Sequence, residues 1–252
     1  MNFNSRRSWI VAGIAVYVLF LLVTLPASLV SARLAKRGVM TSSTSGSVWH
    51  GQVTGLQVGV LNLGNAEWHL RFLPLLTGKL AADIKLVQPN GFADARVAAS
   101  LSGSIVLSDV SASLPLQSIV GSGGLPGGWT GTAQAKIAEV VLKNGWPVSA
   151  QGTLDLVDLT GPARQPSNIG AYRIKFPAAN APADTLMGTL EALQGAALDV
   201  TGTLKFAADR SYQLDTMVAA RGNAPQNLAE GMQYLGSPDA QGRRPFSVSG
   251  TL

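Results

Sequence analysis

The sequence predicts a mainly β protein, in which one N-terminal transmembrane helix precedes a curved antiparallel β-sheet or sandwich-like domain with few short helices. Three observations support this fold class. An uncharged apolar stretch runs from Trp9 to Val30. Beyond it, apolar residues recur at every second position in several segments, which is typical of strands with one apolar and one solvated face. The 28 glycines and 13 prolines supply the tight turns of a many-stranded sheet.

The stretch Trp9–Val30 is predicted to be a membrane anchor. As a helix it would run roughly 33 Å, enough to cross a hydrocarbon core of about 30 Å. Pro26 is expected to kink or weaken its last turn. A cleaved signal peptide is the alternative, with Val30-Ser31-Ala32 nearest to a cleavage site. The apolar region is longer than a typical signal-peptide core, however, and no A-x-A triplet follows it.

The chain divides into four predicted segments. Residues 1–8 form a cytoplasmic tail, 9–30 the transmembrane helix, 31–45 a basic juxtamembrane segment and polar linker, and 46–252 a β-rich domain. Loop charge alone does not decide the orientation, because two arginines precede the span and three basic residues follow it. A short tail ahead of a large β domain favours export of the C-terminal part.

The formal net charge of +5 comes from the region around the anchor. Five of the 19 basic residues lie in the first 40 positions, which carry no acidic residue, so the other 14 balance the 14 acidic residues. We therefore expect the anchor and juxtamembrane segment to contact anionic membrane lipids, and we expect no nucleic-acid partner. The chain contains no cysteine, which excludes disulfides and thiolate metal sites.

The predicted elements follow one another along the domain. Apolar and polar residues alternate in Lys79–Val87, Arg96–Ser108, Leu198–Ala207, Ser211–Val218 and Phe246–Leu252. Short helices are predicted at Pro182–Leu193 and Pro225–Leu235. The proline-containing apolar runs Leu73–Leu76 and Leu114–Val120 are predicted to be turns or single helical turns. Similar tryptophan-led stretches after Gly46 and Gly127 suggest two similar β layers with a seam near residues 121–128, unless the similarity is coincidental.

No catalytic constellation is visible. His50 and His69 have no carboxylate at metal-ligand spacing, and no G-x-S-x-G motif is present. The glycine-rich run 121–128 lacks the G-K-[ST] of a phosphate-binding loop. Asp155 and Asp158 have no base beside them. We therefore predict no catalytic, cofactor-binding or metal site, no cofactor, and a protein that is not an enzyme.

An apolar sheet face with few covering helices must be hidden in some way. It can fold on itself, hold an acyl chain or meet a partner protein, and the sequence leaves these alternatives open. The candidate partner or apolar-ligand contacts are Trp49, in a glycine-bounded turn, and Leu56, Val58 and Val60 on the strand that follows. Tryptophans on strands are more often packing anchors than ligand contacts.

Several motifs carry a family resemblance. The anchor ends in Leu25-Pro26-Ala27, Gly46-Ser47-Val48-Trp49-His50-Gly51 follows, and Trp68–Leu75 reads W-H-L-R-F-L-P-L. Together with the closing strand Phe246–Leu252, these motifs resemble the type II secretion system protein N (general secretion pathway protein N) family. The resemblance covers most of the chain, but its motifs are structural, so no functional residue is carried over.

The resemblance implies a bitopic inner-membrane protein of Gram-negative bacteria with a periplasmic β domain. It implies a non-enzymatic accessory role in export of folded proteins across the outer membrane, with other inner-membrane platform subunits of the type II secretion system as partners. The layout is more distantly similar to AsmA-like proteins, which implies a periplasmic lipid-binding or lipid-transfer protein as the alternative. AsmA-like chains are usually much longer.

Overall fold

The computed structural model describes residues 5–36, 38–59, 61–75, 77–100, 103–120, 128–161, 167–177 and 186–251. The helices are α1 (Ser5–Val23), α2 (Ser28–Ala35), α3 (Phe72–Leu75), α4 (Gln117–Val120) and α5 (Gln226–Gly231), with a 3₁₀ turn η1 (Met232–Tyr234) after α5. The strands are β1 (Val39–Met40), β2 (Ser43–Gly46), β3 (His50–Val58), β4 (Leu61–Arg71), β5 (Lys79–Gln88), β6 (Gly91–Ser100), β7 (Ser104–Pro115), β8 (Thr130–Lys143), β9 (Trp146–Thr160), β10 (Asn168–Phe176), β11 (Leu186–Ala192), β12 (Leu198–Phe206), β13 (Ser211–Ala220) and β14 (Arg244–Thr251).

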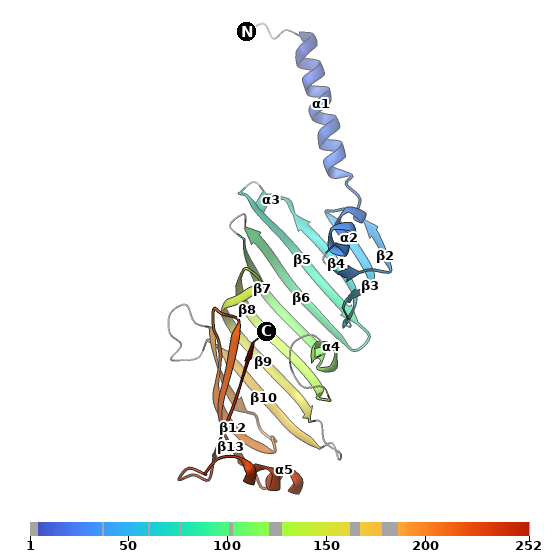
Figure 1. Cartoon of the computed structure of the whole chain (residues 1–252). Coiled ribbons are helices and arrows are strands. Elements are labelled where there is room, and N and C mark those ends of the chain that lie inside the picture. The colour runs from blue at the N-terminus through green and yellow to red at the C-terminus, as the bar shows by residue number, and fades with distance from the viewer. Residues whose placement is uncertain are drawn as a thin grey trace.

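These strands form one antiparallel sheet, which confirms the predicted mainly β class. From β3 to β14 each strand pairs with the next one in the sequence, and β1 and β2 both pair with β3. Figure 1 shows a long, twisted and curved sheet, with α1 projecting from one end and α5 lying at the other. The described strands therefore belong to one sheet, in which β7 pairs with β8 across the predicted seam. Residues 121–127 of that seam lie outside the described residues.

The alternation of β5 shows why these segments form strands with two different faces. Its apolar residues oppose apolar partners, as Ala82 opposes Val97, while Asp83 opposes Arg96. Because directly opposed residues of antiparallel strands lie on the same face, the mainly apolar sides of neighbouring strands form one side of the sheet. We call this apolar side the inner face and the polar side the outer face. From β5 to β12 the paired inner-face residues carry no charge.

The buried core lies on the inner face, towards the two ends of the strand order. One cluster joins β3 and β4, and the others lie on β8 to β13 together with the segments that close them at one end. The buried residues of these clusters are Val53, Leu56 and Ala66; Leu116 and Ala133; Ala150, Ile174, Phe176 and Leu186; and Tyr172, Ala196, Val200, Val218 and Met232. The inner face of the middle strands β5 to β7 contributes none of them.

The N-terminal region differs from the prediction of one helix over 9–30. Helix α1 ends at Val23, and Pro26 pairs with Ser47 in an isolated bridge. The Ala27 N–H donates to the Gly46 carbonyl at 3.1 Å, so this segment follows the sheet instead of continuing the helix. Proline favours this break because it cannot supply the N–H that a helix requires. Within the residues that the structure describes, no helix combines the length and the apolar content needed for a membrane crossing.

The predicted linker, which ends at residue 45, is also partly a strand. β2 pairs with β3 along its whole length, and the hydroxyls of Ser43 and Thr54 lie 2.8 Å apart. The serine and threonine residues of β2 form a polar strand at the edge of the sheet.

Two further predictions are corrected, and two are confirmed. The helix expected at Pro182–Leu193 is wrong over its described part, where β11 forms; residues 182–185 lie outside the description. The single alternating stretch Arg96–Ser108 is divided between β6 and β7, with Gly103 at φ 81° in the turn. The helix predicted at Pro225–Leu235 is confirmed by α5 and η1. The single helical turns are confirmed as α3 and α4.

Candidate functional site

Trp49 lies in a turn that packs against the end of β4. The Trp49 carbonyl accepts a hydrogen bond from the Leu70 N–H at 2.8 Å, and its ring centroid is 6.1 Å from that of Phe72. The neighbouring Val48 carbonyl accepts a 2.8 Å hydrogen bond from Trp68 Nε1. The turn is therefore held in place by β4, and the half-buried Trp49 presents only part of its surface outward. That it contacts a partner stays a prediction.

The other predicted contact residues do not form one uncovered surface. Leu56 is 9% exposed and belongs to the cluster with Val53 and Ala66, so its side chain is core. Val58 is 38% exposed at the end of β3, and Val60 lies outside the described residues. The pairing of β3 with β4 shifts register on both sides of Leu56, which interrupts the simple alternation that the sequence suggested.

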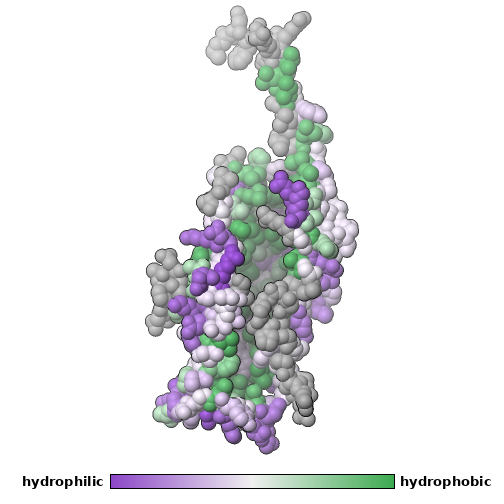
Figure 2. All heavy atoms as spheres, in the orientation of Figure 1, coloured by the Kyte–Doolittle hydropathy of each residue, from purple (hydrophilic) through white to green (hydrophobic). Residues whose placement is uncertain are grey.

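An apolar surface that is not buried lies elsewhere in the β domain, on the inner face of the middle strands. Among the described residues, no inner-face side chain of β5, β6 or β7 is buried, although nearly all of them are apolar. We call this surface the inner trough, and it consists of Leu80, Ala82, Ile84, Leu86, Ala93, Val97, Ala99, Ile105, Leu107, Val110 and Ala112. Figure 2 shows hydrophobic residues gathered in a hollow along the middle of the molecule, with hydrophilic residues flanking it.

The two ends of the inner trough differ. At the end where β7 finishes, Leu116 is buried and α4 contacts both β7 and β4, on either side of β5 and β6. At the other end lies α3, whose Phe72 and Leu73 are 59% and 77% exposed. Leu80 is 51% exposed beside them at the start of β5. Figure 1 places this open end on the side of the sheet from which α1 projects.

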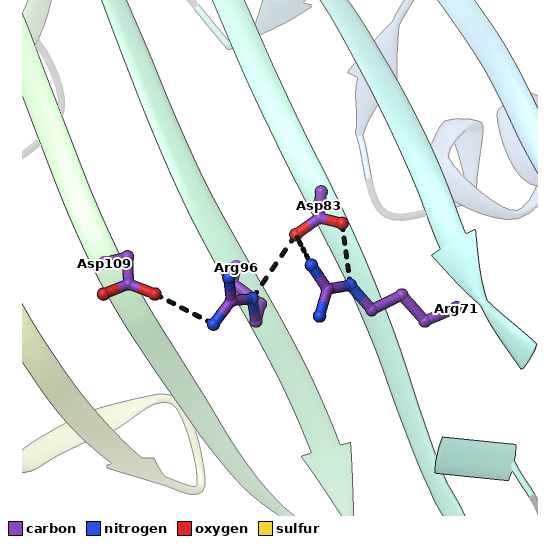
Figure 3. A network of polar contacts seen from close by, with 4 residues as sticks. All are labelled: Arg71, Asp83, Arg96 and Asp109. Atoms are coloured by element: carbon purple, nitrogen blue, oxygen red, sulfur yellow. Dashed lines mark hydrogen bonds and ion pairs between the residues drawn. The ribbon is translucent and has the colours of Figure 1, made fainter. Parts of the chain in front are cut away.

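The outer face carries a ladder of charged residues across four strands (Figure 3). Asp83 accepts two hydrogen bonds from Arg71, at 2.8 Å from Nε and 3.0 Å from Nη2. Arg96 lies 3.5 Å from Asp83 and 2.9 Å from Asp109 on its other side. The Arg71 hydrogen bonds hold the pKa of the Asp83 carboxyl below its usual value, against a smaller opposing effect of burial. The four charged side chains of the ladder form ion pairs across β4 to β7, so the ladder stabilises the pairing of these strands.

His50 and His69 stack on the outer face at the edge of this ladder. Their ring centroids are 3.7 Å apart, and the two residues oppose each other in β3 and β4. Glu67, Asp83 and Lys85 line the same shallow depression. In the part of the chain that the structure describes, no three histidine, aspartate or glutamate side chains are arranged to hold a metal ion.

Sequence reasoning missed the outer-face ion pairs. Asp155, which has no base near it in the sequence, lies 2.7 Å from Arg173 Nε and 2.6 Å from Arg173 Nη2 across the β9–β10 pair. Asp199 likewise lies 2.7 Å from Arg221 Nη2. The signal was absent from the sequence because the partners come together only through the strand register. The inner trough, in contrast, was implied by the alternation of β5.

Comparisons with known proteins agree with the resemblance carried by the Trp49 motif. A family model described as type II secretion system (T2SS), protein N, matches residues 37–247. The chain is 26% identical over 219 residues to the type II secretion system protein N of Vibrio cholerae serotype O1, which covers 85% of this chain and 86% of that protein. It is 28% identical over 255 residues to the type II secretion system protein N of Aeromonas hydrophila, with 94% of each covered. No solved structure matches the chain significantly. Because the family match extends from the first strand into the last, the chain belongs to the type II secretion system protein N family.

Proposed function

We propose that this chain is a non-enzymatic accessory component of a type II secretion system, acting in export of folded proteins across the outer membrane. The observation that carries the proposal is the family match over residues 37–247, which includes nearly the whole sheet. Both curated relatives are matched over most of their own length. The shared region is thus nearly the entire β domain and not a small module.

We place the chain in the inner membrane, with a single N-terminal anchor and the β domain in the periplasm. The support is the surface of α1, where Trp9, Tyr17 and Phe20 are 78%, 63% and 62% exposed. The apolar part of α1, Trp9–Val23, spans roughly 22 Å as a helix. Bilayers accommodate such short apolar stretches by local thinning and by snorkelling of flanking polar residues. Arg33, in the last turn of α2, would then lie near the lipid headgroups.

The β domain would act by binding the other inner-membrane platform subunits. The polar groups of the outer face support a binding role over catalysis, because the arginines and aspartates of the ladder are used in pairing one another. The proposed contacts are the partly exposed Val58, which opposes Val39 of β1, and the half-buried Trp49 in the turn before β3.

Deletion of the chain, followed by complementation with the wild-type protein, tests the proposal. We expect less exoprotein outside the cell after deletion, accumulation of folded exoprotein in the periplasm, and recovery on complementation. Protease added to spheroplasts should degrade the β domain, and the intact chain should sediment with the inner membrane. Unchanged secretion in a strain without a second copy of the family would contradict the proposed role.

A photoreactive amino acid at Val58 tests the proposed contact. Crosslinking in cells should yield an adduct with an inner-membrane subunit of the secretion system. Gln134, which is exposed on the outer face of β8, serves as the control position. Equal adducts at both positions would show that Val58 is not a specific contact.

A further inference from the structure

We propose that the inner trough holds one acyl chain of a membrane phospholipid, which enters at the end formed by α3 and Leu80. The inference rests on the proposed placement of α1 in the membrane and adds a ligand, its binding surface and its point of entry. The trough is the apolar surface of β5, β6 and β7 defined above.

The apolar lining of the inner trough favours an acyl chain over an extended peptide as the occupant. The paired inner-face residues from β5 to β7 are apolar except for Gln88 at the end of β5, and no charged side chain is among them. The backbone groups of these strands are already used in sheet pairing. An extended peptide would bring N–H and C=O groups that find no partner on such a surface, and leaving them unpaired is costly. An acyl chain brings no polar group along its length and gains from apolar contact at every carbon.

The trough is closed at the end where β7 finishes and open at the end of the sheet from which α1 projects. Leu116 and α4 lie at the closed end, whereas Phe72, Leu73 and Leu80 are exposed apolar residues at the open end. With α1 in the bilayer, this open end is the one nearest the membrane (Figure 1). An acyl chain could therefore pass from the lipid layer onto α3 and Leu80, and from there into the trough, along a continuous apolar surface.

The dimensions and the charges of the open end agree with a phospholipid. From Leu80 to Leu86 the strand extends roughly 20 Å, which exceeds the approximately 15 Å of one leaflet of a hydrocarbon core. The strand ends around the opening carry the exposed Lys79 and Lys143, both at outer-face positions, and residues 71–80, 99–105 and 142–146 contain no acidic residue. A lipid phosphate left at the opening would thus meet positive charge.

In-cell photocrosslinking from the two faces of β6 tests this proposal. Benzoylphenylalanine would replace Val97 on the inner face, its neighbour Ala98 on the outer face, or Tyr17 on α1, in full-length protein from cells grown with radioactive phosphate. We expect labelled phospholipid adducts at Val97 and Tyr17, and none above background at Ala98. Protein adducts at Val97, or equal lipid labelling at Val97 and Ala98, would overturn the proposal.

Tyr17 separates the two proposals. Lipid adducts at Tyr17 without any at Val97 would leave the membrane anchor standing and overturn the acyl-chain site. An absence of lipid adducts at Tyr17 would instead overturn the anchor, on which the acyl-chain site depends.

A charge at the opening tests the route of entry. Leu80→Asp is expected to lower phospholipid adducts at Val97 by about tenfold or more, because an unpaired charge in an apolar path is strongly disfavoured. Val87→Asp is the matched control, since Val87 lies on the same strand, is 54% exposed and is directed to the outer face. Unchanged labelling with Leu80→Asp, or an equal loss with both variants, would overturn entry past Leu80.

Discussion

Trp146 and Phe206 meet edge to face, with ring centroids 5.9 Å apart and ring planes inclined by 69°. Trp146 begins β9 and Phe206 ends β12, so two further strands lie between them in the sheet. Their contact requires the sheet to curl strongly over β9 to β12. The curl closes the inner face of the C-terminal half on itself, which explains why buried clusters occur there and not on β5 to β7.

The contact between these rings should contribute to stability. Phe206→Ala is expected to lower the free energy of unfolding by about 2–4 kcal/mol, because a packed aromatic ring is replaced by a cavity. Phe72→Ala, at a ring that is 59% exposed, should cost less than about 1 kcal/mol. Chemical denaturation of the detergent-solubilised full chain measures both. Equal losses would mean that the curl does not depend on this ring pair.

Trp146 can be replaced by a ring without a polar atom. Its Nε1 is buried and has no hydrogen-bond partner among the described residues, a state that typically costs about 1–3 kcal/mol. Trp146→Phe keeps an aromatic contact with Phe206 and removes this N–H, so we expect a change within about 1 kcal/mol. Trp146→Ala should be clearly less stable in the same denaturation experiment. A large loss with Trp146→Phe would indicate that the N–H has a partner in the native protein.

The curl also depends on a missing side chain at Gly188. A β-carbon added there would lie 2.6 Å from a Phe176 ring carbon and 2.8 Å from Ile174 Cγ2. Gly188→Val is therefore expected to cost about 1–3 kcal/mol or more, as overpacking of a closed core does. Gly222→Ala is the control, because no atom lies within 4 Å of the added carbon. Thermal unfolding of both variants should separate them, and similar melting temperatures would contradict the close packing at Gly188.

The outer-face ladder predicts a dependence of stability on pH. Arg71 lowers the pKa of Asp83 in the folded chain, so the carboxylate stabilises the fold above its unfolded pKa of about 3.9. This contribution is lost as the pH falls through the lower folded pKa. Because the pair is partly exposed, Asp83→Asn should cost only about 1 kcal/mol or less at neutral pH.

Unfolding measured at pH 7 and pH 3 checks this dependence. The wild-type protein should lose more stability between these two values than Asp83→Asn, and Arg71→Gln should behave like Asp83→Asn. An identical decrease in all three proteins would show that acid destabilisation has another origin.

The sequence predicted the individual strands and helices better than the way in which they pack together. Lys79–Val87 formed the expected strand because its alternation agrees with sheet packing. The segment after Pro182 was predicted to be a helix because Leu186 and Leu190 are four positions apart, a spacing that fits one face of a helix and also one face of a strand. In the folded chain Leu186 is buried in one cluster with Phe176 and Ile174, and this packing favours the strand. Local propensity carries no information about such packing.

The sequence predicted the apolar character of the candidate site but not which residues the fold brings together there. Alternation placed apolar residues such as Leu80 and Ile84 on one face, and this face became the inner trough. The sequence did not reveal that Leu56, predicted as a contact together with Val58, is buried. The pairing of β3 with β4 shifts register at Leu56, and its side chain lies in the core. The Arg71–Asp83–Arg96 contacts depend on cross-strand register, which one sequence does not reveal.

The consecutive strand order has a consequence for how the domain is made. From β3 onward every strand pairs with the one just before it, so each pairing can form as soon as the next hairpin has been synthesised. Such local pairing avoids the slow search that distant strands require. Growth from the N-terminal strands would add only one new unpaired strand edge at any moment, which limits aggregation in a domain that has no disulfide to hold a partial fold.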